Sequence, residues 1–516
     1  MTDRIPPVLR PEHPISRPLS GLLDAFELEA EGAAEGVELA GVTLSTGDVQ
    51  PGDLFVGIAG AHAHGASYAA DAVEKGAVAV LTDAAGAAIA RAALGETAVP
   101  IVVVDDPRAA LGEISAWVYR TRERPPLLFG TTGTNGKTTT SYLLEAILKQ
   151  LGLVTGLSST AERHIGPLTV VSRLTTPEAS EMHALLARMR ESEVRAVAVE
   201  VSAQALSRHR VDGLWFDVVG FTNLSHDHLD DYANLEEYFQ AKLALFDPDR
   251  AGRGVVLLDS GWGERVVEGS RIPVTTLTAD PAFDAEWRVA IDDERPEYTA
   301  FTVTGPQGRA LTTRVPLIGR HIAADAALAI VMLVEAGFDL GAIDHALSGG
   351  IDAYLPGRTE RVSGDAGPTV YVDFGHSPDA FLRTLQAVRA VTPGRVIMLF
   401  GADGDRDKTK RHEMGRVASE YSDLLVITDH HPRFEDPDAI RATLLEGAAL
   451  AEHPAETHEY SPPERAIRET VALAKEGDAI LWAGPGHQDY RDIRGERTPY
   501  SARELARQAL AEAGWS

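Results

Sequence analysis

Short apolar runs alternate with amphipathic stretches along most of the chain. In the first 120 residues, positions 53–58, 78–81 and 101–104 have the alternating or continuous apolar pattern of strands. Ala-rich stretches at 68–75 and 84–94 separate these runs and have helical periodicity. This order predicts a small α/β unit, and a charged, proline-ended joint at 120–126 marks its end.

Beyond the joint, the pattern changes to apolar strand, glycine-rich loop and long helix. We predict strands at 127–129, 194–199 and 218–221, and a helix over 139–151 after the loop at 130–138. Strands separated by helices favour a mainly parallel sheet. A Pro-Gly-Arg hinge at 356–358 precedes four more strand candidates, at 369–373, 396–400, 424–428 and 479–482.

The length of 516 residues also favours about three domains. We therefore expect an α/β protein with a small first domain at 1–120, a central domain at 121–355 and a third domain at 356–516. No segment has the ~20 apolar residues that cross a bilayer, and the first 20 residues lack the apolar stretch of a signal peptide. The sequence predicts a cytoplasmic protein without membrane insertion.

Composition excludes several classes of chemistry. The chain has no cysteine, which rules out disulfides, thiolate metal sites and a cysteine nucleophile. Its formal net charge of −28 argues against non-specific binding of nucleic acid. Functional lysines and arginines should therefore stand out as local exceptions in an acidic protein.

The loop Gly130-Thr-Thr-Gly-Thr-Asn-Gly-Lys137-Thr138 indicates a phosphate site because it lies between a predicted strand and a predicted helix. Glycines let backbone N–H groups face phosphate oxygens, and the helix N-terminus adds a positive dipole end. Lys137 would reach the β- and γ-phosphates, and Thr138 would hold Mg²⁺. The usual spacing fails by one residue, with Thr131 in the first glycine's place. The loop alone does not separate a ligase from an ATPase or a GTPase.

Further motifs follow this loop in a fixed order. They are Glu200-Val-Ser202, Thr222-Asn-Leu-Ser-His-Asp-His-Leu229, Tyr238-Phe-Gln-Ala-Lys242, Gly357-Arg358-Thr-Glu360, Asp373-Phe-Gly-His-Ser-Pro-Asp379 and Gly404-Asp-Arg-Asp-Lys408. With this series the chain resembles the Mur ligase family over nearly its whole length. It is most similar to the members that add the third residue of the peptidoglycan stem peptide.

The resemblance implies an amide ligase that uses ATP and Mg²⁺. ATP would phosphorylate the terminal carboxylate of UDP-MurNAc-L-Ala-D-Glu, and the amine of a free amino acid would displace the phosphate. It also implies a small uridine-nucleotide domain, a central P-loop ATPase-like domain, a Rossmann-like C-terminal domain and a monomer. Mg²⁺ and cations must surround the charge on the transferring phosphoryl group.

The resemblance also implies the site residues. The catalytic residues would be Lys137, Glu200, His228 and Lys242, and the metal ligands Thr138, Glu200, His228 and a carbamylated Lys242. The ATP contacts would be Gly133, Thr134, Asn135, Gly136, Lys137, Thr138, Thr139, Asp325, Arg358, Asp373, His376 and Lys408. The nucleotide-sugar peptide would contact Leu44, Thr46, His62, Thr175, Thr176, Ser202, Arg208 and Arg210. The incoming amino acid would contact Arg406, His430, His431, Arg433, Gly484 and Gln488.

The chain departs from the family pattern in three places. The uridine loop reads Ser45-Thr46-Gly47 where members usually have Asp-Ser-Arg. The Asp-Asn-Pro-Arg and Gly-x-Gly-His-Glu motifs of diaminopimelate-adding members read His430-His-Pro-Arg433 and Gly484-Pro-Gly-His-Gln488. This loss of two anions argues against diaminopimelate, which has a distal cation. Diaminopimelate stays an alternative for the added residue beside lysine, ornithine, diaminobutyrate and homoserine.

The third departure lies in the adenine contact, where Ile322 and Asp325 replace two asparagines. Ile322 cannot hydrogen-bond adenine, and an ionised Asp325 only accepts hydrogen bonds. Two alternatives therefore stay open at this point. One is another amide ligase of the same superfamily, and the other is a non-catalytic relative that binds the nucleotide-sugar peptide.

Overall fold

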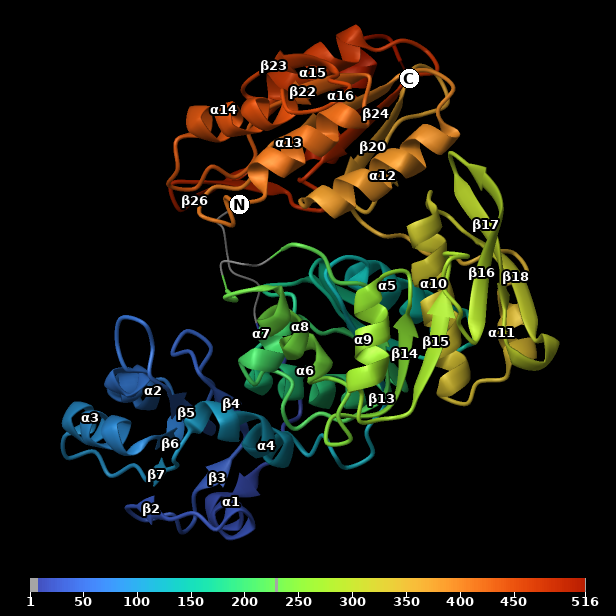
Figure 1. Ribbon diagram of the computed structural model, residues 1–516. Helices are drawn as coiled ribbons and strands as arrows, with labels where there is room; N and C mark the ends of the chain where they lie inside the picture. The colour runs from blue at the N-terminus through green and yellow to red at the C-terminus, as the bar shows by residue number, and fades with distance from the viewer. Residues whose placement is uncertain (1–7, 228–230, 516) are drawn as a thin grey trace.

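Three sheets built mainly of parallel strands organise the computed structural model, which describes residues 8–227 and 231–515 (Figure 1). Their strands lie at 30–103, 127–315 and 360–483 along the chain. Each sheet has an apolar cluster on both faces, so each forms a three-layer α/β unit. The expected three-part α/β architecture is confirmed, whereas the boundaries at 120 and 355 stay predictions.

The N-terminal unit has a five-stranded sheet in the order β2-β7-β6-β5-β4, of which all but β2 run parallel. The strands are β2 (Ala30–Glu31), β4 (Gly41–Thr43), β5 (Asp53–Gly57), β6 (Ala77–Thr82) and β7 (Ile101–Val103), and β1 (Arg17–Pro18) pairs with β3 (Glu38–Leu39) beside them. The helices are α1 (Leu19–Phe26), α2 (Ala69–Glu74), α3 (Ala84–Leu94) and α4 (Pro107–Tyr119). Asp106 starts α4 because its carboxylate accepts from two backbone N–H groups, and Pro107 occupies the first turn.

The central unit has an eleven-stranded sheet in the order β11-β10-β9-β12-β8-β13-β14-β15-β16-β17-β18. The strands from β9 to β16 in this order run parallel, and antiparallel hairpins extend both ends. The strands are β8 (Leu127–Thr132), β9 (Thr155–Ser158), β10 (Glu162–Ile165), β11 (Leu168–Val171), β12 (Ala196–Glu200), β13 (Phe216–Phe221), β14 (Ala251–Leu257), β15 (Val274–Thr278), β16 (Trp287–Arg295), β17 (Tyr298–Thr304) and β18 (Ala310–Val315). The helices are α5 (Lys137–Gln150), α6 (Ala179–Glu191), α7 (Ala203–Ser207), α8 (Leu235–Leu243), α9 (Gly261–Gly269), α10 (Arg320–Glu335) and α11 (Leu340–Ala346).

The C-terminal unit has a six-stranded sheet in the order β19-β20-β24-β21-β22-β23, parallel except for β19. The strands are β19 (Glu360–Arg361), β20 (Thr369–Asp373), β21 (Val396–Phe400), β22 (Leu424–Ile427), β23 (Glu456–Glu459) and β24 (Ala479–Ala483), with a hairpin of β25 (Tyr490–Ile493) and β26 (Glu496–Pro499). The helices are α12 (Pro378–Val391), α13 (Arg411–Glu420), α14 (Pro437–Ala448), α15 (Pro463–Leu473) and α16 (Ala502–Glu512). The four strands expected here are confirmed; β23, whose residues Glu-Thr-His-Glu are all polar, has no apolar pattern to predict it.

The carboxyl ends of the parallel strands in the central and C-terminal units position the loops that matter below. In the central unit, the loops at 133–136, 201–202 and 222–227 follow β8, β12 and β13, respectively. In the C-terminal unit, the loops at 374–377, 401–410, 428–436 and 484–489 follow β20, β21, β22 and β24, respectively. Ligands of open parallel sheets bind at this edge. In Figure 1 the C-terminal unit lies over the central one, and its α12 runs above α5 and α10.

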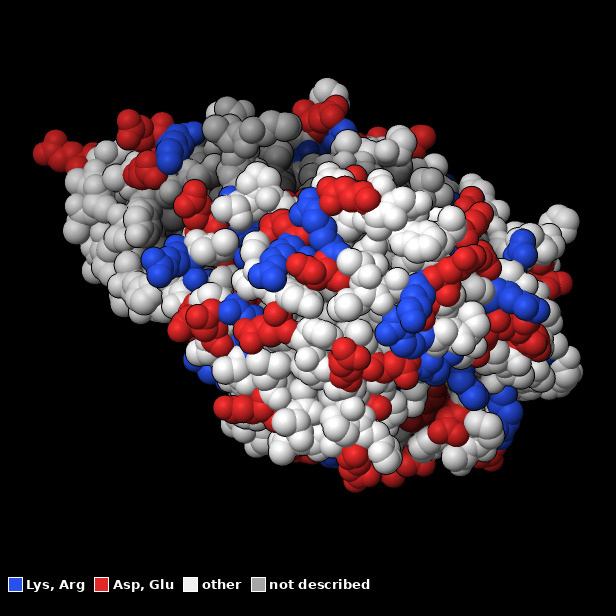
Figure 2. Space-filling model, turned by 90° about the horizontal axis from the view of Figure 1, so that it is seen from above, with Lys and Arg blue, Asp and Glu red and all other residues white. Residues whose placement is uncertain are grey.

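On the face seen in Figure 2, basic and acidic side chains are interspersed and do not gather into one broad basic surface. Over the described part of the chain, every helix is too short or too polar to cross a bilayer.

A buried charge cluster ties the helix after the phosphate loop to the edge of the central sheet. His164 on β10 lies 2.8 Å from Glu145 on α5 and 3.2 Å from Glu162, which also accepts from the Tyr142 hydroxyl. Burial lowers the pKa of His164, but its hydrogen bonds to the two carboxylates outweigh this effect and raise it to about 9. The folded state therefore binds this proton more tightly than the unfolded chain does.

We expect this proton to contribute about 3 kcal/mol to the free energy of unfolding below pH 6.5, and the contribution to be lost as the pH rises to about 9. Urea denaturation of the protein and of His164→Gln should show a difference that is large at pH 6 and small at pH 9.5. Thr457→Val, on the polar strand β23, is a control without a titratable group and should show a difference that does not change with pH. A His164→Gln difference that is equally independent of pH would contradict this account.

Candidate active site

A cavity of about 410 Å³ lies between the central and C-terminal units and joins most of the predicted site. Its central-unit walls include Thr134 to Thr139, Thr160, Thr175, Glu200, Ser202, Arg210, Asp227, Ile322 and Asp325. Its C-terminal walls include Arg358, Asp373, Phe374, His376, Arg383, Asp403, Arg406, Lys410, His430, Arg433, Gly484 and Gln488. Residues from the central and C-terminal units therefore meet around one space.

The phosphate loop turns between β8 and α5 on two glycines with positive φ. Gly133 has φ +147°, and a Cβ there would lie 1.9 Å from the Thr222 hydroxyl oxygen. Gly136 has φ +86°, and a Cβ there would lie 2.6 Å from a carboxylate oxygen of Asp325. Both positions thus require glycine for conformation and for space. Lys137 begins α5, and its Nζ donates to the carbonyl oxygens of Gly133 (3.1 Å) and Thr134 (2.8 Å).

Oxygen ligands suited to a divalent cation face this loop. The Thr138 hydroxyl, on the first turn of α5, donates at 3.0 Å to the carboxylate of Glu200, the last residue of β12. Thr160 donates its backbone N–H (2.8 Å) and its hydroxyl to the same carboxylate. The Arg358 guanidinium reaches in from the C-terminal unit and donates to the Thr138 hydroxyl at 2.9 Å. Hard oxygen donors of this kind are what Mg²⁺ prefers, so the residues present fit that ion.

Lys242 lies on α8 with its side chain only 1% exposed. Its Nζ donates to the Gly133 carbonyl at 2.6 Å, the same oxygen that accepts from Lys137, and lies 4.2 Å from the centre of the Tyr238 ring. Burial, together with the positive charge of Lys137, lowers the pKa of Lys242 well below its ordinary value. The lowered pKa makes the neutral amine, the form that reacts with CO₂, more accessible. The fourth predicted metal ligand, His228, lies outside the described residues.

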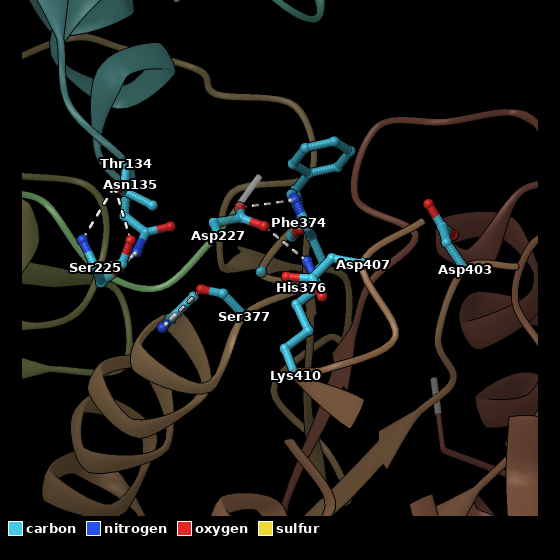
Figure 3. Close-up of polar contacts among 12 residues, drawn as sticks. Thr134, Asn135, Ser225, Asp227, Phe374, His376, Ser377, Asp403, Asp407 and Lys410 are labelled. Carbon is cyan, nitrogen blue, oxygen red and sulfur yellow. Dashed lines mark hydrogen bonds and ion pairs between the residues drawn. The ribbon is translucent and has the colours of Figure 1, made fainter. Parts of the chain in front are cut away.

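Asp227 links the two units at the cavity, and sequence reasoning missed it. Its carboxylate pairs with Lys410 at 2.9 Å and lies 3.7 Å from the His376 ring, both in the C-terminal unit (Figure 3). Lys408, the lysine expected at ATP, instead pairs with Glu435 at 3.1 Å and is 64% exposed. The Asn135 amide adds a contact between the units by donating to Asp379 on α12 at 3.2 Å.

The expected adenine contacts lie together on the first turns of α10. Ile322 lines the cavity and is 3% exposed, so it offers an apolar surface there. Burial raises the pKa of Asp325 well above its ordinary value. The protonated acid, which burial favours, can both donate and accept hydrogen bonds, as the amide of an asparagine does.

The nucleotide-sugar contacts divide between the cavity and the N-terminal unit. Thr175, Ser202 and Arg210 line the cavity, and Arg210 is held by Glu178 at 3.0 Å. Thr176 is buried, and its hydroxyl donates to the Glu200 carbonyl and accepts from the Ser202 N–H. Arg208 is half-exposed and pairs with Asp231. Leu44, Thr46 and His62 lie on loops of the N-terminal unit, and His62 is exposed.

A bidentate ion pair connects those loops to the central unit. Arg173, two residues before Thr175, donates to both carboxylate oxygens of Asp48 at 3.0 and 3.1 Å, next to the loop that carries Leu44 and Thr46. Arg173 is therefore expected to position the N-terminal unit for a substrate that spans both units.

Arg173→Ala should raise the KM for the nucleotide-sugar peptide about 3- to 10-fold and leave the KM for ATP unchanged. Steady-state kinetics with each substrate varied in turn will measure this. Arg91→Ala is the control because Arg91 also pairs with an acid, Glu31, but within the N-terminal unit. An equal rise of both KM values in Arg173→Ala would contradict a role confined to positioning.

Comparison with known proteins gives the family. Models of the Mur ligase middle domain, the Mur ligase glutamate ligase domain and the Mur ligase family catalytic domain match residues 131–333, 357–486 and 38–119. A UDP-N-acetylmuramyl-tripeptide synthetase of Leifsonia xyli subsp. xyli is 60% identical over 517 residues, covering 100% of both chains. The chain belongs to the Mur ligase family.

Other Mur ligases share the whole length of this one. A UDP-N-acetylmuramoyl-L-alanyl-D-glutamate–2,6-diaminopimelate ligase of Streptomyces avermitilis is 42% identical, covering 99% of both chains. A solved structure of a ligase with the same name superposes with a TM-score of 0.66 at 25% identity, covering 98% of this chain and 100% of that chain. The resemblance inferred from the motifs is confirmed. The names of the Streptomyces ligase and of the solved structure specify diaminopimelate as the added amino acid, whereas the name of the Leifsonia synthetase specifies none.

Proposed function

We propose that this Mur ligase uses ATP to add the third amino acid to UDP-MurNAc-L-Ala-D-Glu in peptidoglycan biosynthesis. The observation that carries the proposal is the shared cavity, which joins the phosphate loop and Glu200 to the arginines of the C-terminal unit. The tripeptide synthetase that is 60% identical over the full length supports the same step.

The cations around the phosphate loop suit phosphoryl transfer to a carboxylate. Lys137 and Arg358 would stabilise the negative charge on the transferring group, and Thr138 and Glu200 would hold Mg²⁺. The ion, when bound, would lower the repulsion between ATP and the substrate carboxylate. A carbamylated Lys242 would add an anionic oxygen ligand where a buried ammonium would repel the metal.

The remaining polar residues would hold the two substrates on opposite sides of the phosphates. Ser202 and Arg210 suit the carboxylates of the dipeptide, because a guanidinium binds a carboxylate through two parallel hydrogen bonds. Arg406 suits the α-carboxylate of the incoming amino acid. Closure of the two units over the acyl-phosphate would exclude water, which otherwise hydrolyses it.

The test is phosphate release from ATP by the purified protein with UDP-MurNAc-L-Ala-D-Glu and one amino acid at a time. The amino acids are meso-diaminopimelate, lysine, ornithine, 2,4-diaminobutyrate and homoserine, and mass spectrometry identifies the peptide product. Release that requires both substrates supports the ligase. The absence of release with every amino acid would refute it and favour a non-catalytic relative that binds the nucleotide-sugar peptide.

A further inference from the structure

A row of three charged side chains runs from the N-terminal unit to the cavity. Arg108 lies on the first turn of α4, Glu178 immediately precedes α6, and Arg210 lines the cavity. Arg108 Nη1 donates to one oxygen of the Glu178 carboxylate at 2.9 Å, and Arg210 Nε donates to the other at 3.0 Å. These side chains are 33%, 19% and 12% exposed in that order, so the row becomes more buried toward the cavity.

The backbone around this row is closely packed. α4 and α6 contribute to one apolar cluster, which joins the N-terminal unit to the central one. α4 also approaches the loop that follows α7, because a Cβ at Gly112 would lie 2.3 Å from the Asp212 carbonyl oxygen. In the same loop, the Arg208 carbonyl oxygen accepts from Arg108 Nη1 at 3.4 Å. The N-terminal unit therefore reaches the segment of backbone that carries Arg210.

Arg210 keeps N–H groups for a ligand. A guanidinium has five of them. Nε and Nη2 lie 3.0 Å from the same oxygen of Glu178, and Nη1 donates to the Thr176 carbonyl oxygen at 3.5 Å. These three contacts leave two of the five N–H groups for a carboxylate in the cavity, and Glu178 fixes the direction in which they point.

Arg108 controls how strongly Glu178 neutralises Arg210. A carboxylate that pairs with one guanidinium cancels its charge, whereas a carboxylate shared by two leaves one positive charge uncompensated. Arg108 engages the second oxygen of Glu178. Without Arg108, both oxygens of Glu178 could turn to Arg210 as a bidentate pair and occupy N–H groups that a ligand would otherwise use.

A second carboxylate, that of Glu181, lies one turn further along α6. Burial raises its pKa, and its attractive neighbours are Arg163 and Arg173. Glu181 therefore has cations of its own, and Glu178 remains the carboxylate that holds Arg210.

We propose that Arg108 is a positioning residue for the dipeptide's carboxylate site, and that it acts on Arg210 through Glu178. The proposal rests on the proposed function and extends the dipeptide site into the N-terminal unit, which is expected to bind the uridine nucleotide. Docking of that unit would then orient Arg210 at the same time.

The test is a double-mutant cycle on the affinity for UDP-MurNAc-L-Ala-D-Glu. Titration calorimetry with Mg²⁺ and a non-hydrolysable ATP analogue present measures the Kd without turnover. Arg108→Ala should raise this Kd about 5-fold and leave the Kd of the ATP analogue unchanged. In an Arg210→Ala background, Arg108→Ala should change the Kd less than about 2-fold, because the group through which it acts is gone.

Two further variants keep the test informative if Arg108→Ala folds poorly or Arg210→Ala binds too weakly. Arg108→Lys retains a cation beside Glu178 and should keep part of the affinity. Glu178→Gln serves as a second background, in which Arg108→Ala should also lose its effect. Thermal unfolding of each variant checks that it is folded.

Arg173→Ala is the matched comparison, because Arg173 also joins the N-terminal unit to the central one but does so through Asp48. Its effect on the Kd should be of similar size with and without Arg210, because the two arginines have different carboxylate partners.

The outcomes separate the two proposals. An effect of Arg108→Ala that is equal in both backgrounds would show that Arg108 only docks the N-terminal unit, and would overturn its role in positioning. An unchanged Kd in Arg108→Ala overturns that role as well, while phosphate release decides the ligase separately. Failure of the unaltered protein to bind UDP-MurNAc-L-Ala-D-Glu overturns both proposals.

Discussion

Replacing Lys137 with methionine is expected to lower ATP-dependent peptide formation by about 10³-fold. The Lys137 ammonium lies at the first turn of α5 and donates to two carbonyls of its own loop, so it can exchange these contacts for phosphate oxygens without a change of backbone. Methionine has a similar length but no charge, and the phosphoryl group in transfer would lose its nearest fixed cation.

Phosphate release and product formation at saturating substrates measure this effect. Lys75→Met, on the surface of the N-terminal unit, is the control and should keep full activity because Lys75 is 46% exposed and pairs only with Asp71 among the described residues. Circular dichroism of both variants confirms folding. If Lys137→Met retained more than about a tenth of the activity, the phosphate loop would not have the role that its geometry suggests.

Lys242→Arg is the second variant for which we expect a large loss, about 10²- to 10³-fold. Arginine keeps a positive charge but cannot form a stable carbamate, so the anionic oxygen ligand would be lost. Burial and the charge of Lys137 lower the pKa of Lys242, so the amine is neutral above that pKa and becomes protonated as the pH falls through it. Carbamylation should therefore weaken at acidic pH and recover when bicarbonate is added.

The direct measurement is a ¹³C carbamate resonance from protein incubated with labelled bicarbonate. The signal should be present in the protein, retained in Lys75→Arg and absent from Lys242→Arg. Activity should also fall in degassed buffer without bicarbonate. Full activity of Lys242→Arg would show that Lys242 is not a metal ligand through its carbamate.

Local pattern was enough to predict the elements that carry phosphate chemistry. The loop between β8 and α5 follows from apolar strand, glycines and helix in immediate succession, and Glu200 is the last residue of an apolar strand. The pairing of Asp227 with Lys410 could not be predicted, because it depends on how two units meet across 183 positions of sequence. The same holds for Asp403 and His430, which come from loops after two different strands.

The antiparallel additions to the central sheet were missed for another reason. β10 and β11 are short and partly polar. β16 to β18 alternate apolar and exposed residues without an α-helix between them. A search for alternating strands and helices passes over such hairpins. They lie at the two ends of the sheet. The turn that leads into β10 nevertheless carries Thr160, which donates to Glu200.

If Arg358 acts on the phosphates, its place in the C-terminal unit would let the enzyme avoid wasting ATP. Its guanidinium belongs to the C-terminal unit but bonds to Thr138 in the phosphate loop of the central one. GTPases that depend on an activating protein for their arginine hydrolyse nucleotide slowly until that partner arrives. Here one chain carries both parts. ATP bound to the central unit alone would therefore be hydrolysed slowly until the C-terminal unit, which is expected to bind the amino acid, also places Arg358 at the phosphates.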